Sequence, residues 1–174
     1  MAGTNQGRNG LRAGFLVEIS LDGFGLNVRM ALQGALESIG TFFRVDVSDR
    51  PRNVDDLSPA DARRLLGPKA IVGYSTHTIE QIDRAVLEPA SYIAVGPVFG
   101  TTTKDTGYSA VGLDLVRSAV ARAQDRPVVA IGGVTLERAA SVIAAGAAAV
   151  AVIGDLLSTG KPEERVRSYL EALA

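Results

Sequence analysis

The sequence lacks cysteine and tryptophan, and it contains a single histidine, His77. Without cysteine the chain can form neither disulfides nor thiolate-based catalytic or metal sites. Its 18 basic and 19 acidic residues nearly cancel, so no excess positive charge is available to bind nucleic acid or an acidic membrane surface. No apolar run is long enough to span a bilayer, and residues 1–14 lack the apolar segment of a signal peptide. We therefore expect a cytoplasmic protein that binds neither nucleic acid nor membranes.

What the sequence does contain is mainly aliphatic: 47% of its 174 residues are hydrophobic, but only 5% are aromatic. A chain of this length can bury the core of one domain without disulfides. Short unbroken runs of aliphatic residues alternate with segments in which apolar residues recur at helical spacing. This pattern is typical of a parallel sheet covered by helices. We expect residues 1–14 to be flexible and residues 15–174 to form a single domain, in which residues 15–55 follow the pattern less clearly.

The regular part of the pattern begins at Ser58. Strands are predicted over residues 15–21, 42–47, 70–74, 91–98, 127–131 and 148–153, with a helix of residues 26–39 between the first two. Capping residues and helical spacing predict helices in the remaining gaps and at the end of the chain. Glycine turns follow the last two strands and not the first, which favours a TIM-type (β/α) barrel over a doubly wound sheet. The prediction is an α/β protein with an incomplete barrel of about six strands instead of eight.

Polar residues and glycines gather where the predicted strands end. They are Ser75 and His77 after the 70–74 strand, Thr101, Thr102, Thr103 and Lys104 after the 91–98 strand, and Gly132, Gly133 and Gly154 after the last two. In a barrel, the carboxyl ends of all strands share one face, so these groups would meet there. Hydroxyls, an ammonium group and the backbone N–H groups of glycines together suit a bound phosphate.

Several of these residues also have a purely structural explanation. A Gly-Gly pair can simply make a tight turn, and Thr78 can cap a helix. A turn made by the threonines would leave Lys104 unexplained. His77 could serve as a general base, but no partner carboxylate can be named, and an orienting or hydrogen-bonding role toward a substrate is preferred. Asp55 and Asp56, just before the predicted helix start, are either solvated charge or include one ligand of magnesium.

Four segments resemble the carboxyl-terminal two-thirds of thiamine-phosphate synthases, over about residues 56–173. They are STHT at 75–78, GPVFGTTTK at 96–104, AIGGV at 130–134 and AVIGDLL at 151–157. The resemblance implies a (β/α) barrel that couples hydroxymethylpyrimidine diphosphate to thiazole phosphate with Mg²⁺, giving thiamine phosphate and pyrophosphate. It further implies that Ser75 and Lys104 contact the pyrimidine diphosphate in catalysis and that Asp56 binds the metal. Contacts to the thiazole phosphate are implied for Thr101, Thr102, Thr103, Gly132, Gly133, Ile153 and Gly154.

The first third of the chain departs from the family pattern. The family's Gln-x-Arg-x-Lys and Asn-Asp-Arg motifs are missing, and Gly154 stands where the family usually has a serine. We therefore expect a chain that binds thiazole phosphate but turns over slowly or not at all. The alternatives are a non-catalytic phosphate-binding or regulatory module and an isomerase similar to the thiazole tautomerases. A partial barrel that completes itself as a homo-oligomer is also considered, because open sheet edges need a cover.

Overall fold

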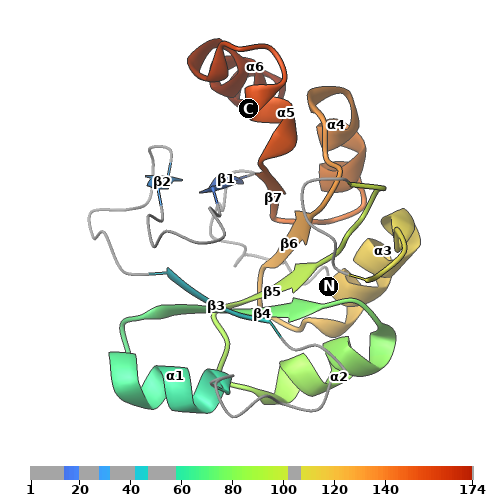
Figure 1. Cartoon of the computed structure of the whole chain (residues 1–174). Helices are drawn as coiled ribbons and strands as arrows, with labels where there is room; N and C mark the ends of the chain where they lie inside the picture. Colours follow the sequence, from blue (N-terminus) through green and yellow to red (C-terminus); the bar gives the residue numbers. More distant parts are fainter. Residues whose placement is uncertain (1–13, 20–27, 32–41, 47–57, 102–106, 174) are drawn as a thin grey trace, which may run out of the picture.

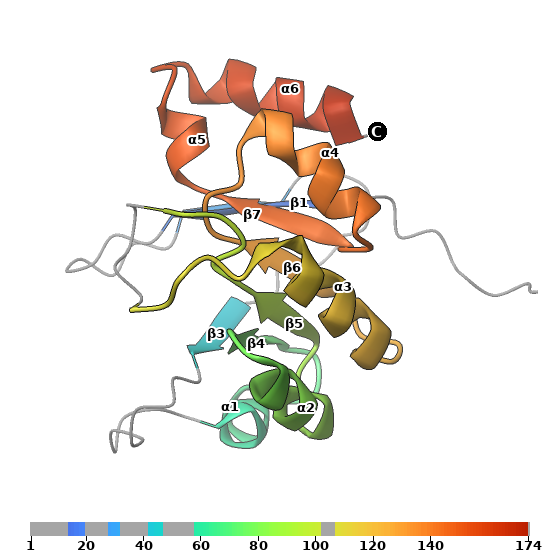
Figure 2. The same ribbon diagram turned by 90° about the vertical axis from the view of Figure 1, so that its right-hand side faces the viewer.

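The computed structural model describes residues 14–19, 28–31, 42–46, 58–101 and 107–173, and in the first three of these ranges it describes the backbone alone. The strands in the described residues are β1 (Gly14–Ile19), β2 (Val28–Ala31), β3 (Phe42–Asp46), β4 (Ile71–Thr76), β5 (Tyr92–Val95), β6 (Val128–Ile131) and β7 (Ala149–Val152). They form one sheet in the order β2-β1-β7-β6-β5-β4-β3. Neighbouring strands run parallel, except that β2 pairs antiparallel with β1. Figure 2 shows β7, β6, β5 and β4 one after another in this sheet.

In the described residues, helices and strands alternate from α1 to β7, and two helices follow the last strand. They are α1 (Pro59–Leu66), α2 (Ile79–Leu87), α3 (Gly112–Arg122), α4 (Leu136–Ala144), α5 (Gly154–Leu157) and α6 (Pro162–Leu173). Figure 1 shows α2, α3 and α4 on the outer side of the sheet. Ser58 caps α1, and Thr78 caps α2 as predicted. Their side-chain oxygens accept hydrogen bonds from the amides of Asp61 at 3.0 Å and of Gln81 at 3.3 Å. Within the described residues, no helix combines the length and apolarity that a bilayer crossing needs.

The core lies between the parallel strands and the outer helices. Ile93 of β5 and Val150 of β7 are fully buried, and so are Ile82 of α2 and Val142 of α4. Consecutive side chains of the central strands are buried, which explains why these strands are unbroken apolar runs. The expected α/β class, with helices covering a parallel sheet, is therefore confirmed.

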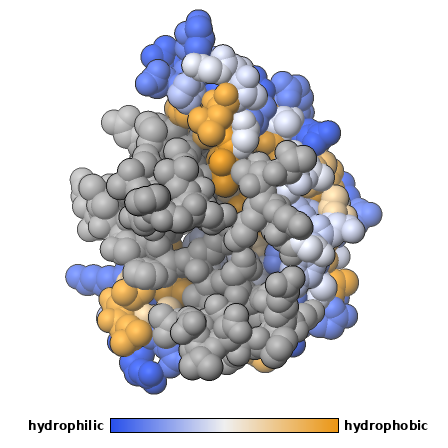
Figure 3. All heavy atoms as spheres, in the orientation of Figure 1, coloured by the Kyte–Doolittle hydropathy of each residue, from blue (hydrophilic) through white to orange (hydrophobic). Residues whose placement is uncertain are grey.

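The helix α1 has both buried and exposed hydrophobic residues. Its buried residues are Pro59 and Ala62, whereas Leu65 is 66% exposed and Leu66 is 37% exposed. Figure 3 shows a hydrophobic group of atoms over α1, next to hydrophilic surface. The buried side of this helix packs against β4 through a short apolar face.

One part of the predicted architecture is corrected. The described residues contain seven strands and not six, because Val28–Ala31 forms β2 where a helix of residues 26–39 was expected. Antiparallel pairing with β1 outweighs the helical spacing there, as tertiary contacts commonly do. Within the described residues the sheet order has two ends, β2 and β3, so the incomplete barrel stays a prediction. Residues 1–13 lie outside the described residues, so the flexibility expected there stays a prediction, as does the single domain.

Candidate functional site

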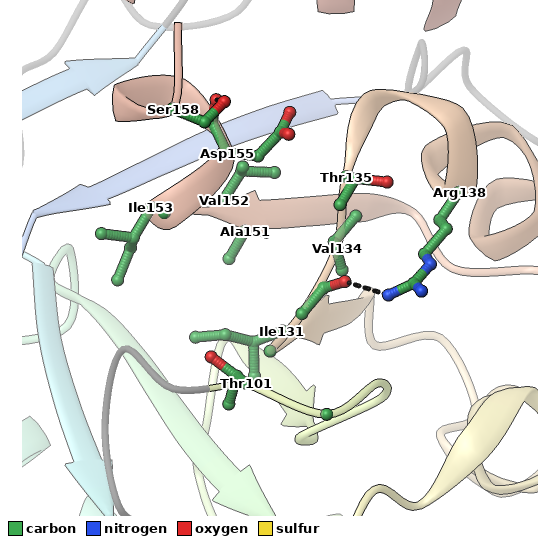
Figure 4. Close-up of a pocket in the computed structure, with 14 residues that line it drawn as sticks. Thr101, Ile131, Val134, Thr135, Arg138, Ala151, Val152, Ile153, Asp155 and Ser158 are labelled. Carbon is green, nitrogen blue, oxygen red and sulfur yellow. Dashed lines mark hydrogen bonds between the residues drawn. The ribbon is translucent and has the colours of Figure 1, made fainter. Parts of the chain in front are cut away.

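A pocket of about 320 Å³ opens where β6 and β7 end, which is large enough for a small ligand. It is lined by the segments that leave these strands, by the start of α4 and by the loop after β5 (Figure 4). The lining residues are Gly100, Thr101, Ile131, Gly132, Gly133, Val134, Thr135, Arg138, Ala151, Val152, Ile153, Gly154, Asp155 and Ser158. The pocket therefore lies at the carboxyl edge of the parallel strands, where α/β proteins place their ligands.

The glycine pair after β6 allows two loops to touch. Gly132 and Gly133 have φ angles of +92° and +62°, which residues with side chains rarely adopt. A Cβ on Gly132 would lie 2.6 Å from the Cα of Pro97, and a Cβ on Gly133 would lie 2.5 Å from the carbonyl oxygen of Gly100. The amide of Phe99 donates to the carbonyl of Gly132 at 3.0 Å. The pair therefore has a structural reason to be glycine, and it also forms one wall of the pocket.

Three glycines that line this pocket lie at two strand ends. Within the described part of the chain, the amides of Gly132, Gly133 and Gly154 donate no hydrogen bond. Gly154 is the first residue of α5, and the first amides of a helix have no partner inside the helix. Successive amides in a tight turn form concave sites that attract anions. The pocket thus offers donors for a negatively charged group.

The guanidinium of Arg138 lies at the edge of the same pocket. Its Nη1 donates to the carbonyl of Gly133 at 3.1 Å, the bond drawn in Figure 4. Its Cζ lies 4.8 Å from the centroid of the Phe99 ring, within the range of a cation–π contact. These two contacts hold a positive charge beside the glycine turn.

On the other side of the pocket, Asp155 joins three helices. Its carboxylate accepts from Nε and Nη2 of Arg165 at 2.9 and 3.0 Å, from the hydroxyl of Tyr169 at 2.7 Å and from the amide of Leu136 at 3.2 Å. Arg165 also donates to Glu137 at 3.2 Å. Residues of α4 and α6 thereby hold α5, and with it the amide of Gly154.

The same hydrogen bonds set the titration of these groups. Burial by itself would raise the pKa of Asp155, but the hydrogen bonds from Arg165 and Tyr169 outweigh it and lower this pKa below its usual value. Burial raises the pKa of Tyr169, and the hydrogen bond to Asp155 raises it further. Asp155 is therefore a charged group that is already neutralised by Arg165.

The structure brings five of the predicted site residues together: Thr101, Gly132, Gly133, Ile153 and Gly154 all line the pocket. Their role toward a ligand stays a prediction. Four others, Thr102, Thr103, Lys104 and Asp56, lie outside the described residues.

Ser75 and His77 are not among the residues that line this pocket. Ser75 is buried near the end of β4. The Nδ1–H of His77 donates to the carbonyl of Gly96, and its ring stacks on Tyr108 with centroids 3.8 Å apart. The amide of His77 donates to Oε1 of Gln81 at 2.5 Å. The described contacts of His77 are those of an oriented, hydrogen-bonded ring.

The predicted magnesium site cannot be located among the described residues. Among the described residues, no group of three or more histidine, aspartate or glutamate side chains gathers to hold a metal. The predicted ligand, Asp56, lies outside them. Magnesium binding therefore stays a prediction.

Sequence reasoning missed Arg138 and the pairing of Asp155 with Arg165 and Tyr169. Arg138 gave one local signal that was overlooked. It is the third residue of α4, and basic side chains are unfavourable in the first turn of a helix. Nothing local links Asp155 to residues 10 and 14 positions further on.

Comparison with known proteins gives concordant matches. A family model described as thiamine monophosphate synthase matches residues 52–156, a range that includes every pocket residue except Ser158. The thiamine-phosphate synthase of Koribacter versatilis is 47% identical over 119 residues, which are 68% of this chain and 55% of that protein. That of Roseiflexus castenholzii is 42% identical over 121 residues, which are 69% and 52% of the two chains. The chain thus spans about half the length of these curated relatives.

Among solved structures, thiamine phosphate pyrophosphorylase from Pyrococcus furiosus superimposes with a TM-score of 0.62. The two chains are 24% identical, and the match covers 77% of this chain and 58% of the other. At this identity the likeness supports the fold, namely helices around a parallel sheet.

Proposed function

Because this chain belongs to the thiamine monophosphate synthase family, we propose that its pocket binds thiazole phosphate for coupling to hydroxymethylpyrimidine diphosphate. The observation that carries the proposal is the meeting of Thr101 with the amides of Gly132, Gly133 and Gly154 in one pocket. These groups come from the ends of β5, β6 and β7, and they are the donors that a phosphate needs. The products of the coupling are thiamine phosphate and pyrophosphate.

The proposed chemistry makes modest demands on the protein. Pyrophosphate leaves the methylene group of the pyrimidine, and the thiazole nitrogen captures the cation that forms. No protein nucleophile is needed, so holding and orienting the two substrates can supply much of the rate enhancement. The glycine amides and Thr101 hold the thiazole phosphate, while Ser75 and Lys104 are proposed to contact the diphosphate.

Magnesium remains part of the proposal only through Asp56, which matches a ligand of the family. Because no metal-ligating group gathers among the described residues, we assign the metal no step. We likewise propose that the sheet is part of an incomplete (β/α) barrel and that the protein is cytoplasmic and able to form a homo-oligomer. The molecular mass in solution tests the last of these.

The test is to titrate the purified chain separately with thiazole phosphate and with pyrimidine diphosphate, and then to assay thiamine phosphate formation. We expect saturable binding of thiazole phosphate and slow or absent turnover. A chain that fails to bind thiazole phosphate would overturn the proposal, and turnover at ordinary enzyme rates would overturn the expected impairment. Binding of the thiazole alone, with no response to the pyrimidine, would favour a binding or regulatory module.

A gain-of-function variant sharpens this test. Gly154 has no positive φ, so a serine fits its backbone, and the new hydroxyl would add a donor beside the phosphate. We expect Gly154→Ser to tighten thiazole phosphate binding by roughly fivefold, the value of about one hydrogen bond. Gly160→Ser is the control, because Gly160 lies outside the pocket. Equal affinities for both variants and the parent chain would argue against Gly154 as a phosphate contact.

A further inference from the structure

Among the residues that line the pocket, two carry charged side chains, Arg138 and Asp155. The charge of Asp155 is neutralised, because Arg165 binds both of its carboxylate oxygens. Within the described part of the chain, Arg138 forms no ion pair. Among the described lining residues, the charge of Arg138 is therefore the one that is uncompensated, and it is positive.

Arg138 lies in α4 at a position that is unfavourable for a positive charge. It is the third residue of that helix, where the aligned peptide dipoles favour an anion and disfavour a cation. Glu137, the acidic residue of the same turn, is bound to Arg165. A guanidinium at this point thus lacks a stabilising negative partner in the described residues, and a bound anion would supply one.

The side chain is also held in place before any ligand arrives. One of its five N–H groups donates to the carbonyl of Gly133, and its plane contacts the ring of Phe99. No other hydrogen bond from the guanidinium is found within the described residues, so the remaining donors are available. A planar fork of this kind matches two oxygens of a phosphate, and restricting its motion beforehand lowers the entropic cost of binding.

We propose that Arg138 is a further binding residue, which contacts the phosphate monoester of the ligand across the pocket from Gly154. The inference rests on the proposed function, because it assumes that the pocket takes a phosphorylated substrate. It goes beyond that function by adding a side-chain charge to a site otherwise formed by backbone amides and Thr101. Part of the affinity should then be electrostatic and should weaken as ionic strength rises.

The experiment measures binding of inorganic phosphate and of thiazole phosphate to the full chain and to Arg138→Gln. Glutamine keeps a polar side chain with N–H donors but removes the charge. We expect both affinities to fall about tenfold and to depend less on salt. Arg138→Lys should be intermediate, because it keeps the charge and loses the fork. Arg117→Gln removes one positive charge outside the pocket, so it should change binding less than twofold.

Stability without ligand separates a binding role from a structural one. If Arg138 only anchored the glycine turn, Arg138→Gln would lower the melting temperature and leave phosphate affinity unchanged, and the inference would be overturned. We expect instead an unchanged or slightly higher melting temperature, because a cation leaves the start of a helix. A parent chain that binds neither probe would refute the proposed function itself. Binding by the parent chain that Arg138→Gln retains in full would refute the role of Arg138 alone.

Discussion

Removing the carboxylate of Asp155 should detach α5 from its neighbours and destabilise the whole domain. Its two oxygens accept four hydrogen bonds, two of them from Arg165 and one each from Tyr169 and the amide of Leu136. These donors belong to α4 and α6, so one side chain connects three helices at the end of β7. Asp155→Ala removes all four bonds and leaves Arg165 facing a small cavity.

The size of the effect follows from burial. The side chain of Asp155 is 10% exposed and that of Arg165 is 18% exposed, so solvent screens the pair only in part. Removing one partner of a fully buried pair costs about 3–5 kcal/mol, and a hydrogen bond to a charged group contributes about 1.5–3 kcal/mol. Because Arg165 keeps some access to water and a bond to Glu137, we expect the low end, about 3 kcal/mol for Asp155→Ala. For a domain of this size that corresponds to roughly 6–12 °C in Tm.

The assay is thermal and guanidinium chloride unfolding followed by circular dichroism. The matched control is Asp114→Ala, which breaks the ion pair with Arg117 on α3. That pair also joins aspartate to arginine, but its side chains are 98% and 58% exposed, so its loss should cost less than about 0.5 kcal/mol. A double-mutant cycle of Asp155→Asn with Arg165→Met should give a coupling energy of about 1–3 kcal/mol. The reasoning fails if Asp155→Ala is no more destabilising than Asp114→Ala.

Three further predictions concern the same region. First, because the folded pKa of Asp155 is lowered, its contribution to stability is complete above the unfolded pKa and is lost as pH falls through the folded pKa. Unfolding midpoints of the parent chain and Asp155→Asn, measured between about pH 2 and 7, should therefore begin to converge as pH falls below about 4, the unfolded pKa. They should meet only below the folded pKa. Second, Tyr169→Phe should cost about 1.5 kcal/mol by equilibrium unfolding, since it deletes a 2.7 Å bond to a charged acceptor; an unchanged midpoint would show that water replaces the hydroxyl. Third, Gly133→Ala should destabilise more than Gly160→Ala. Both have positive φ, of +62° and +68°, but only Gly133 would place a Cβ against another loop, so equal losses would contradict the steric argument.

Most of the fold between Ser58 and the end of the chain could be predicted, because its signals are local. The runs at 127–131 and 148–153 coincide within a residue or two with β6 and β7, and the caps of α1 and α2 lie where the sequence places them. The run at 91–98 forms a strand only to Val95. Beyond it, the amides of Val98 and Phe99 donate to the carbonyls of Ile131 and Gly132. The spacing of residues in the sequence does not predict this contact between loops. The strand Val28–Ala31 was missed for a similar reason, since its pairing partner is another segment.

In the candidate site, too, some residues could be predicted from the sequence and others could not. Thr101, the glycine pair and Gly154 could be expected to meet, because the carboxyl ends of neighbouring parallel strands must share an edge. The faces that α4, α5 and α6 turn toward one another depend on helix packing, so the contacts of Asp155 with α4 and α6 could not be read from spacing. Arg138 is different, because its local setting was unfavourable for a cation and therefore needed a reason. A charge that is unfavourable at its position in a helix is a signal that can be read from the sequence. In this chain that signal identifies Arg138, a residue that lines the pocket.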